Sequence, residues 1–448
     1  KDKQLQSRKG EASSVRIDAK QGAETQDPRE WEWVEAEVWT ERMLAALANG
    51  VKGGKWYSMM DKVYARRTLE AAWKQVEKNC GAAGIDRMGI GSFRENKDRY
   101  LQELHESLRE GSYRPEAVRR VHIPKGEGKT RPLGIPTVKD RVTQTALKMA
   151  LEPIFEKEFL PMSYGFRPGR GCKDALREVD GHIKAGYTWV VDADLKSYFD
   201  SIPRERLLNR LEEKIGDGRI LSLVDSYLRQ KIVEGMKEWM PMAGTPQGAV
   251  ISPLLANVYL HPLDKLMTEA GYKMVRYADD FVILCRNREE AEGVLAKARA
   301  WTEANGLMLH PEKTHVGNCL EAGQGFEFLG YRFEAGRREV RKKSLHTLKD
   351  KMRGKTKRTR GDSIERIIED INPILKGWFG YFKHAIPSTF KAMDGFTRRR
   401  LRALLRKQQK RPGQGRCLAD HQRWPNAFFA ELGLFTMVEA QVLARQSR

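Results

Sequence analysis

The stretch Lys273–Cys285 reads KMVRYADDFVILC and contains two apolar runs separated only by Asp279 and Asp280. The runs Lys273–Ala278 and Phe281–Cys285 predict two strands joined by a tight turn. Two adjacent carboxylates in such a turn are costly, because like charges raise each other's pKa. Divalent cations such as Mg²⁺ remove that cost, and phosphoryl-transfer enzymes place them between carboxylates and phosphates. The alternative is that the two aspartates simply form a polar hairpin turn.

A second acidic strand is predicted upstream. Thr188–Leu195 (TWVVDADL) is a β-branched and aromatic run, which is typical of a buried strand. Alternation along that strand places Asp192 and Asp194 on one face, with Asp194 at its end. Asp194, Asp279 and Asp280 together supply the three carboxylates, from two strands, that a two-metal site needs. Asp192 and Asp200 could each instead cap a helix or form a surface ion pair.

The middle of the chain has a mixed α and β pattern. Arg99–Glu110 places its leucines on one helical face and stops at a glycine, and Arg288–Asn305 also has helical spacing. Val118–Ile123 alternates as a strand would and precedes a turn at residues 126–129. Phe326–Phe333 (FEFLGYRF) alternates again and is predicted to be one strand.

Composition narrows the class of protein. The 448 residues carry a formal net charge of +21, and 40% of them are hydrophobic, which is enough for a packed core. This charge predicts a polyanionic partner, either nucleic acid or an anionic membrane surface. The longest stretch without a charged residue, Trp239–Leu263, contains four prolines and cannot be one membrane-spanning helix. Five cysteines with no Cys-x-x-Cys pair, and no secretory signal at the start, predict an intracellular protein that handles nucleic acid rather than a disulfide scaffold.

The positive charge is concentrated near the C-terminus. Arg341–Arg411 contains 22 lysines and arginines against 6 acidic residues, which is +16 of the total +21. Aromatic residues are interleaved at helical spacing, which predicts a basic helical domain that contacts RNA.

An ordered set of motifs resembles a known family. DLKSYFD (194–200), GTPQGAVISPLLAN (244–257) and RYADDF (276–281) resemble the central blocks of group II intron-encoded reverse transcriptases, or maturases. Earlier and later blocks follow in the family's order, and they are GID (84–86), RRVHIPKGEGKTRPLGIPTVKDR (119–141), SYGFRPGR (163–170), LHPEKT (309–314) and FLGY (328–331). The resemblance covers roughly residues 60 to 440.

The resemblance implies an α+β right-hand polymerase with fingers, an antiparallel-sheet palm and an α-helical thumb. The expected segments are a disordered tail (1–30), an N-terminal extension with fingers (31–187), the palm (188–338), a basic thumb or maturase domain (339–411) and a short C-terminal segment (412–448). The HNH endonuclease module of many relatives is not expected, because only Cys417 and His421 lie beyond residue 411 as candidate ligands.

The resemblance also implies roles for individual residues. Asp194, Asp279 and Asp280 would be catalytic and would bind two Mg²⁺ ions, with Mn²⁺ as a substitute. Nucleotide binding would involve Lys125 and Arg131 at the triphosphate, Phe199 as the steric gate that excludes a ribose 2′-hydroxyl, and Gln247. Ala249 stands where the family usually has glycine. The residues expected to bind RNA are Arg167, Arg170, Lys376, Arg398, Arg399 and Arg400.

The expected function is an RNA-directed DNA polymerase that copies intron RNA into cDNA and helps that RNA to splice. Its partners would be group II intron RNA, an RNA template with a DNA primer, target DNA and deoxynucleoside triphosphates, with no membrane. A bacterial cytoplasmic location is expected, and an organellar origin stays open. Two alternatives remain at this point, namely a related reverse transcriptase adopted for DNA repair, CRISPR or phage defence, and a non-catalytic RNA-binding splicing factor.

Overall fold

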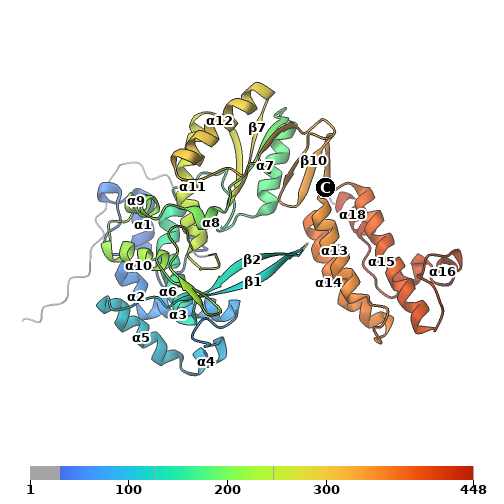
Figure 1. The fold of residues 1–448 in the computed structure, drawn as a ribbon, viewed down its shortest axis with the longest axis horizontal. Helices are drawn as coiled ribbons and strands as arrows, with labels where there is room; N and C mark the ends of the chain where they lie inside the picture. The colour runs from blue at the N-terminus through green and yellow to red at the C-terminus, as the bar shows by residue number, and fades with distance from the viewer. Residues whose placement is uncertain (1–30, 127, 246, 447–448) are drawn as a thin grey trace, which may run out of the picture. The chain divides into compact units, whose positions relative to one another are not determined.

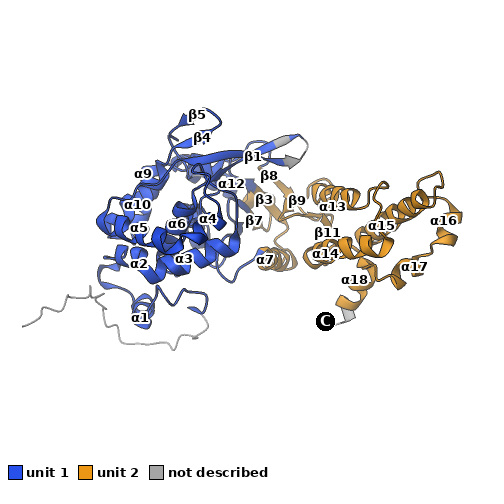
Figure 2. Cartoon of the chain, turned by 90° about the horizontal axis from the view of Figure 1, so that it is seen from below, with its two compact units in different colours: residues 1–171, 193–281, 294–313 blue, residues 172–192, 282–293, 314–448 orange. Residues whose placement is uncertain are grey.

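The computed structural model describes residues 31–126, 128–245 and 247–446. The predicted disordered tail, residues 1–30, lies outside the described residues. The chain forms two compact units (Figure 2), each assembled from separate segments. Unit 1 contains residues up to 171, 193–281 and 294–313, and unit 2 contains 172–192, 282–293 and 314 onward. Both units draw on the middle of the chain, so they do not follow the five expected segments, whose boundaries remain predictions.

Unit 1 is mainly helical. Its helices are α1 (Glu41–Asn49), the 3₁₀ helix η2 (Lys52–Gly54), α2 (Met60–Tyr64), α3 (Arg66–Asn79), α4 (Ile90–Glu95), α5 (Lys97–Glu110), α6 (Val138–Glu156), α8 (Tyr198–Ser201), α9 (Arg204–Glu212), α10 (Gly218–Leu228) and α11 (Ser252–Glu269). The predicted helix at 99–110 is confirmed as α5, and it ends at Gly111, whose φ of 77° is left-handed. Leu101, Leu104 and Leu108 form its buried face.

A four-stranded sheet of unit 1 contains the predicted strand at 118–123. Its order is β2-β1-β4-β5, from strands β1 (Val118–Gly126), β2 (Lys129–Ile135), β4 (Ile232–Glu234) and β5 (Lys237–Trp239). β1 and β2 form a long antiparallel hairpin (Figure 1), in which Arg120 lies opposite Gly134 and Ile123 opposite Arg131. β4 is parallel to β1 and antiparallel to β5.

A second four-stranded sheet contains the acidic strands. Its order is β6-β7-β3-β8, from β3 (Trp189–Asp194), β6 (Lys273–Tyr277), β7 (Asp280–Cys285) and β8 (His315–Asn318). β3 and β8 are antiparallel. The interiors of β3, β6 and β7 are buried, as expected for their apolar runs. The three predicted strands are therefore confirmed, as is the predicted helix that follows them, α12 (Arg288–Ala304).

The single strand predicted at Phe326–Phe333 is wrong. The segment forms two strands, β9 (Phe326–Phe328) and β10 (Tyr331–Glu334), which pair antiparallel with each other, and β11 (Arg337–Val340) completes the sheet. Leu329 and Gly330 form the connection, with φ of 48° and 86°. Two successive positive φ values give a tight hairpin turn whose twist matches the strands, so the alternation of side chains hides a reversal of direction.

Unit 2 continues into the predicted basic helical region. Its helices are α7 (Cys172–Lys184), α13 (Lys342–Lys355), α14 (Ile364–Phe382), α15 (Pro387–Gln408), α16 (Leu418–Arg423), α17 (Asn426–Glu431) and α18 (Met437–Gln446). The hydroxyl of Ser363 caps α14 by accepting from the amide of Arg366. Along α14, Ile364, Ile367 and Ile371 are buried at helical spacing, so one face forms the core and leaves the other to charged residues.

The described structure is therefore α+β with antiparallel strand pairs, as predicted. No helix among its described residues is both long enough and apolar enough to cross a membrane.

Candidate active site

The turn between β6 and β7 carries Asp279. β6 ends at Tyr277 and β7 begins at Asp280, so only two residues connect the strands. Ala278, the first of them, is buried and has a φ of 61°, in the region that side-chain-bearing residues seldom adopt. Such a conformation persists only where the surrounding contacts fix it.

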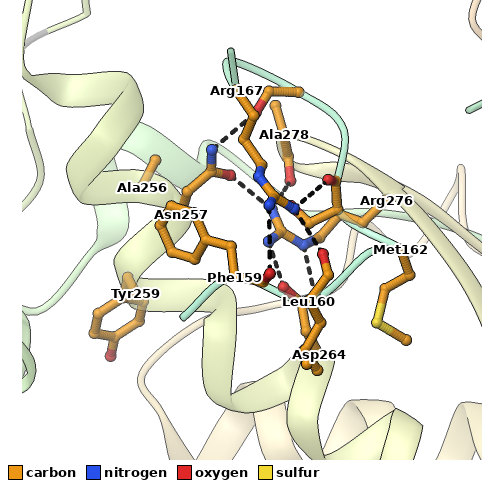
Figure 3. Close-up of polar contacts among 12 residues, drawn as sticks. Phe159, Leu160, Met162, Arg167, Ala256, Asn257, Tyr259, Asp264, Arg276 and Ala278 are labelled. Atoms are coloured by element: carbon orange, nitrogen blue, oxygen red, sulfur yellow. Dashed lines mark hydrogen bonds and ion pairs between the residues drawn. The ribbon is translucent and has the colours of Figure 1, made fainter. Parts of the chain in front are cut away.

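Arg276 of β6 makes the contacts that fix this turn (Figure 3). Its Nε and Nη2 donate to the two carboxylate oxygens of Asp264, in α11, at 2.7 and 2.5 Å. Its Nη1 donates to the carbonyl of Ala278 and to Oδ1 of Asn257, each at 2.9 Å. Both charged side chains are 0% exposed. Burial acts to lower the pKa of Arg276, but the charge and hydrogen bonds of Asp264 outweigh burial and raise it, so the guanidinium stays charged.

Gly165 packs directly against the same turn. A Cβ at this position would lie 2.3 Å from the amide nitrogen of Ala278, so no larger residue fits without a shift of backbone. The carbonyl of Gly165 accepts from Nδ2 of Asn257 at 2.8 Å, and the amide of Tyr164 donates to the carbonyl of Arg276 at 2.9 Å. The SYGF motif, α11 and β6 therefore hold the aspartate turn from three sides.

Asp194, at the end of β3, is bound to a later segment of unit 1. Its carbonyl accepts from the amide of His310 at 2.7 Å, and its carboxylate forms an ion pair with Lys313. The neighbouring amide of Lys196 donates to the carbonyl of Met308 at 2.9 Å. Residues 308–313, which contain most of the LHPEKT motif, are thus fastened along Asp194.

Asp194 and Asp279 lie within electrostatic reach of each other. Burial raises the pKa of Asp279 and the charge of Asp194 raises it further, whereas its own amide, Lys313 and Arg131 lower it. Two hard carboxylates that repel each other form a donor set that suits a divalent cation. Within the described residues, however, no three His, Cys, Asp or Glu side chains are gathered as a metal centre. Asp280 follows Asp279 directly as the first residue of β7, and its role as the third acidic residue stays a prediction.

The predicted triphosphate residues lie on the β1–β2 hairpin. Arg131, in β2, is exposed, and its charge reaches Asp279, whose pKa it lowers. The side chain of Lys125 lies outside the described part of the structure.

The predicted gate and the glutamine lie close to each other. Phe199 is half-buried and packs edge-on against Tyr198, with ring centroids 5.7 Å apart. Its carbonyl accepts from the amide of Thr245 at 2.6 Å. Two residues further on, Nε2 of Gln247 donates to Oδ2 of Asp200 at 3.1 Å.

Arg167 does not fit its predicted role in RNA binding. Its side chain is 2% exposed and forms a two-pronged ion pair with Glu156. Its remaining donors bond to the carbonyls of Phe159, Leu160 and Ser163. A buried guanidinium with its donors satisfied inside the protein holds the loop together and cannot reach a phosphate. Arg170 is half-buried and donates to the carbonyl of Pro161 at 2.8 Å.

Three of the predicted C-terminal cations keep part or most of their surface in solvent. Lys376 is exposed on α14, and Arg398 and Arg399 are half-buried on α15. The guanidinium of Arg399 lies 5.4 Å from the ring centroid of Phe396, which Lys349 and Arg353 also approach. Lys349, Arg353 and Arg399 thus place three cations around the ring of Phe396.

Arg400 is placed differently from its neighbours. It donates to the hydroxyl and the carbonyl of Thr356, at 3.0 and 2.7 Å, and so closes the end of α13. Burial lowers the pKa of Arg400, and the charges of neighbouring arginines lower it further. It contributes to packing within unit 2 more than to a binding surface.

Sequence reasoning missed the residues that support the aspartates. Arg276, Asn257 and Lys313 all stand inside motifs that were already recognised, RYADDF, GTPQGAVISPLLAN and LHPEKT. Asp264 lies outside them, seven residues after Asn257, on the same helix face. The available clue was Arg276, a charged residue just before the predicted turn that carries Asp279.

Two described protein families and several known proteins are similar to this chain. Residues 123–333 match the family described as reverse transcriptase (RNA-dependent DNA polymerase), and residues 345–424 match the group II intron maturase-specific domain. Over 308 residues, 60% of this chain and 78% of the relative, the chain is 32% identical to Protein YkfC of Escherichia coli (strain K12). Over 208 residues, 46% of this chain, it is 38% identical to the group II intron-encoded protein LtrA of Lactococcus lactis subsp. cremoris. The chain belongs to the group II intron-encoded reverse transcriptases.

Membership in the group II intron-encoded reverse transcriptases confirms the expected right-hand polymerase class, with a reverse transcriptase domain followed by a maturase domain. Reverse transcriptase domains depend on divalent metal ions. The match spans only 34% of LtrA. Among solved structures, a partial Cas6-RT-Cas1–Cas2 complex matches with a TM-score of 0.35 and 25% identity, covering 58% of this chain and 43% of that chain.

Proposed function

We propose that this chain is an RNA-directed DNA polymerase that copies intron RNA into DNA. The observation that supports it is the pair Asp194 and Asp279, two mutually repelling carboxylates next to the cations Arg131 and Lys313. In the proposed reaction, the 3′-hydroxyl of a DNA primer attacks the α-phosphate of a deoxynucleoside triphosphate, and pyrophosphate leaves. Fixed charges of both signs at one place are what this transfer of negative charge requires.

The metal ions would be held by Asp194 and Asp279, with Asp280 as the third acidic residue. We expect two Mg²⁺ ions, which Mn²⁺ would replace. Bound there, they supply positive charge at the attacking and leaving oxygens. Lys313 neutralises Asp194 in the described structure, so its ammonium has to release that carboxylate when the site is in use.

The nucleotide would be held by the β1–β2 hairpin and the gate. Arg131 would bind triphosphate oxygens with its forked guanidinium, and Lys125 would add a point charge. Phe199 would lie beneath the sugar, where its ring leaves no room for a 2′-hydroxyl, and Gln247 would lie near the new base pair.

The basic helices α13–α15 would bind the intron RNA and help it to splice. Lys376, Arg398 and Arg399 are the predicted contacts that the structure leaves accessible, with Arg170 as a further candidate in unit 1. Such a protein would work in the cytoplasm as a ribonucleoprotein with its intron RNA, and would also meet target DNA.

The test is Asp279→Asn, with Asp98→Asn as the matched control, because the side chain of Asp98 is 80% exposed on α5. Asp279→Asn removes one anionic ligand and relieves repulsion, so the fold and RNA affinity should persist. Primer extension on an RNA template should fall by at least about 10²-fold, the scale of losing one charge-stabilising group. Extension within tenfold of the parent rate would show that the aspartate assignment is wrong. A parent protein that binds intron RNA and promotes splicing without extending a primer would instead be a non-catalytic splicing factor.

A further inference from the structure

The described residues 244–245 and 247–251, here called the glutamine strap, are hydrogen-bonded to three other elements of unit 1. The amide of Gly244 donates to the carbonyl of Ile202 at 2.9 Å, and the amide of Thr245 donates to the carbonyl of Phe199 at 2.6 Å. At the other end, the amide of Val250 donates to Oε1 of Gln144, in α6, at 2.8 Å. The strap is therefore fixed to the gate turn and to a buried helix.

Between these two ends, the backbone of Gln247 is bound to the β1–β2 hairpin. Its carbonyl accepts from the amide of Gly134, in β2, at 2.7 Å. The next residue, Gly248, has a φ of 100°, and a Cβ there would lie 2.3 Å from the carbonyl oxygen of Gly134. The carbonyl of Gln247 and the backbone of Gly248 are thus held against β2, which leaves the side-chain torsions of Gln247 to be fixed.

Asp200 fixes those torsions. Its Oδ2 accepts from Nε2 of Gln247 at 3.1 Å. The carboxylate lines a small pocket together with Arg120, Thr245 and Gln247. Arg120 lies on β1, opposite Gly134, and its ring-stacked guanidinium is 5.0 Å from the centroid of Trp239. An ionised acceptor close to a fixed cation makes the stronger class of hydrogen bond.

Asp200 takes no direct part in the proposed reaction. It follows the predicted gate residue directly, yet its side chain contacts the glutamine rather than Asp194 or Asp279. Burial raises the pKa of Asp200, whereas Arg120 and the Gln247 hydrogen bond lower it. Asp200 is exposed, yet its carboxylate is hydrogen-bonded to the amide of Gln247, and this bond sets the orientation of that amide.

We propose that Asp200 is a positioning residue for nucleotide selection, which holds the Gln247 side chain in one orientation before the nucleotide arrives. This inference rests on the proposed polymerase function. Holding the amide beforehand removes the loss of side-chain freedom that binding would otherwise impose. Because the Phe199 carbonyl and the Gly134 amide hold the same strap, Asp200 also links the gate turn to β2.

The experiment measures nucleotide affinity without turnover. Parent and variants are loaded with an RNA template and a chain-terminated DNA primer, and the affinity of each complex for the complementary and a mismatched deoxynucleoside triphosphate is determined. Asp200→Ala should weaken binding of the complementary nucleotide by about five- to tenfold, the range of one ordinary intramolecular hydrogen bond, and should reduce the difference in affinity between the complementary and the mismatched nucleotide. Asp200→Asn keeps an acceptor and should restore most of the affinity. The exposed Glu205→Ala, on α9, is the control and should match the parent.

A double-mutant cycle separates positioning from general damage. If Asp200 acts through Gln247, Asp200→Ala should have no further effect in a Gln247→Ala background. Losses that simply multiply, or an Asp200→Ala protein with parental affinity and selectivity, would overturn the proposal. If the parent protein binds the complementary nucleotide but does not extend a normal primer, only the proposed polymerase function is contradicted. If the parent protein does not bind the nucleotide, the polymerase function and the role of Asp200 are both contradicted.

Discussion

Removing one partner of the buried pair Arg276–Asp264 should destabilise unit 1 strongly. In Asp264→Asn the guanidinium loses its counter-charge while both side chains stay at 0% exposure. Breaking a buried ion pair in this way costs about 3–5 kcal/mol, a large part of the roughly 5–15 kcal/mol that stabilises a typical domain. The variant should unfold at clearly lower urea concentration than the parent.

Removing both partners separates stability from activity. Arg276→Met combined with Asp264→Leu leaves no uncompensated charge, and such exchanges are often neutral or stabilising. The same double variant lacks the two hydrogen bonds from Arg276 to Ala278 and Asn257, at 2.9 Å each. The strained turn that carries Asp279 then has no arginine donor on its carbonyl. We therefore expect parental or near-parental stability together with primer extension reduced by at least about tenfold, the equivalent of 1.4 kcal/mol.

Urea unfolding and primer extension on the parent, the single variant and the double variant decide the matter. The reasoning is refuted if Asp264→Asn is as stable as the parent, because the pair would then not be buried in solution. It is equally refuted if the stable double variant extends primers at the parental rate, because the turn would then hold its shape without Arg276.

Two further predictions concern other parts of the chain. Burial raises the pKa of Asp140 from 3.8 to about 6, despite hydrogen bonds that lower it. The protonated carboxyl therefore makes its full contribution to stability below about pH 4, and this contribution is lost as the pH rises through 6. The stability of Asp140→Asn relative to the parent should therefore rise by about 3 kcal/mol between pH 4 and pH 8. A stability difference between the two proteins that stays constant over this pH range would contradict the prediction. Replacing Arg398 and Arg399 by alanine should weaken RNA binding, and the log–log slope of affinity against salt should fall by about 0.7–0.9 for each phosphate that is no longer neutralised. Affinities in a salt series measure this slope, and primer extension at saturating primer–template should be preserved. An unchanged slope would show that these two arginines do not contact RNA.

Much of the fold could be predicted because the relevant information is local. The strands on both sides of Asp279 follow from short apolar runs, and the end of α5 follows from one glycine. The failure at Phe326–Phe333 has an equally local cause. Period-two alternation continues through Leu329 and Gly330, and only their backbone angles reveal the hairpin.

The support of the candidate site could not be predicted, because it depends on partners that are distant along the chain. Nothing in the residues around Asp194 indicates that Lys313 will pair with it across more than a hundred positions. Arg167 shows the opposite error, since it was expected to bind RNA. Its burial against Glu156 became visible only when the loop was folded.

The interleaving of the two units has a consequence for how the protein is made. Unit 1 needs residues as late as 313, so no prefix of the nascent chain shorter than this can complete it. Thereafter the ribosome still has at least 135 residues of unit 2 to add, from Thr314 to Arg448. At roughly 5–20 residues per second this takes about 7–27 s. The fold that carries the aspartates can therefore close before the strongly cationic helices α13–α15 are complete, and newly made polymerase has an interval in which to fold before it captures RNA.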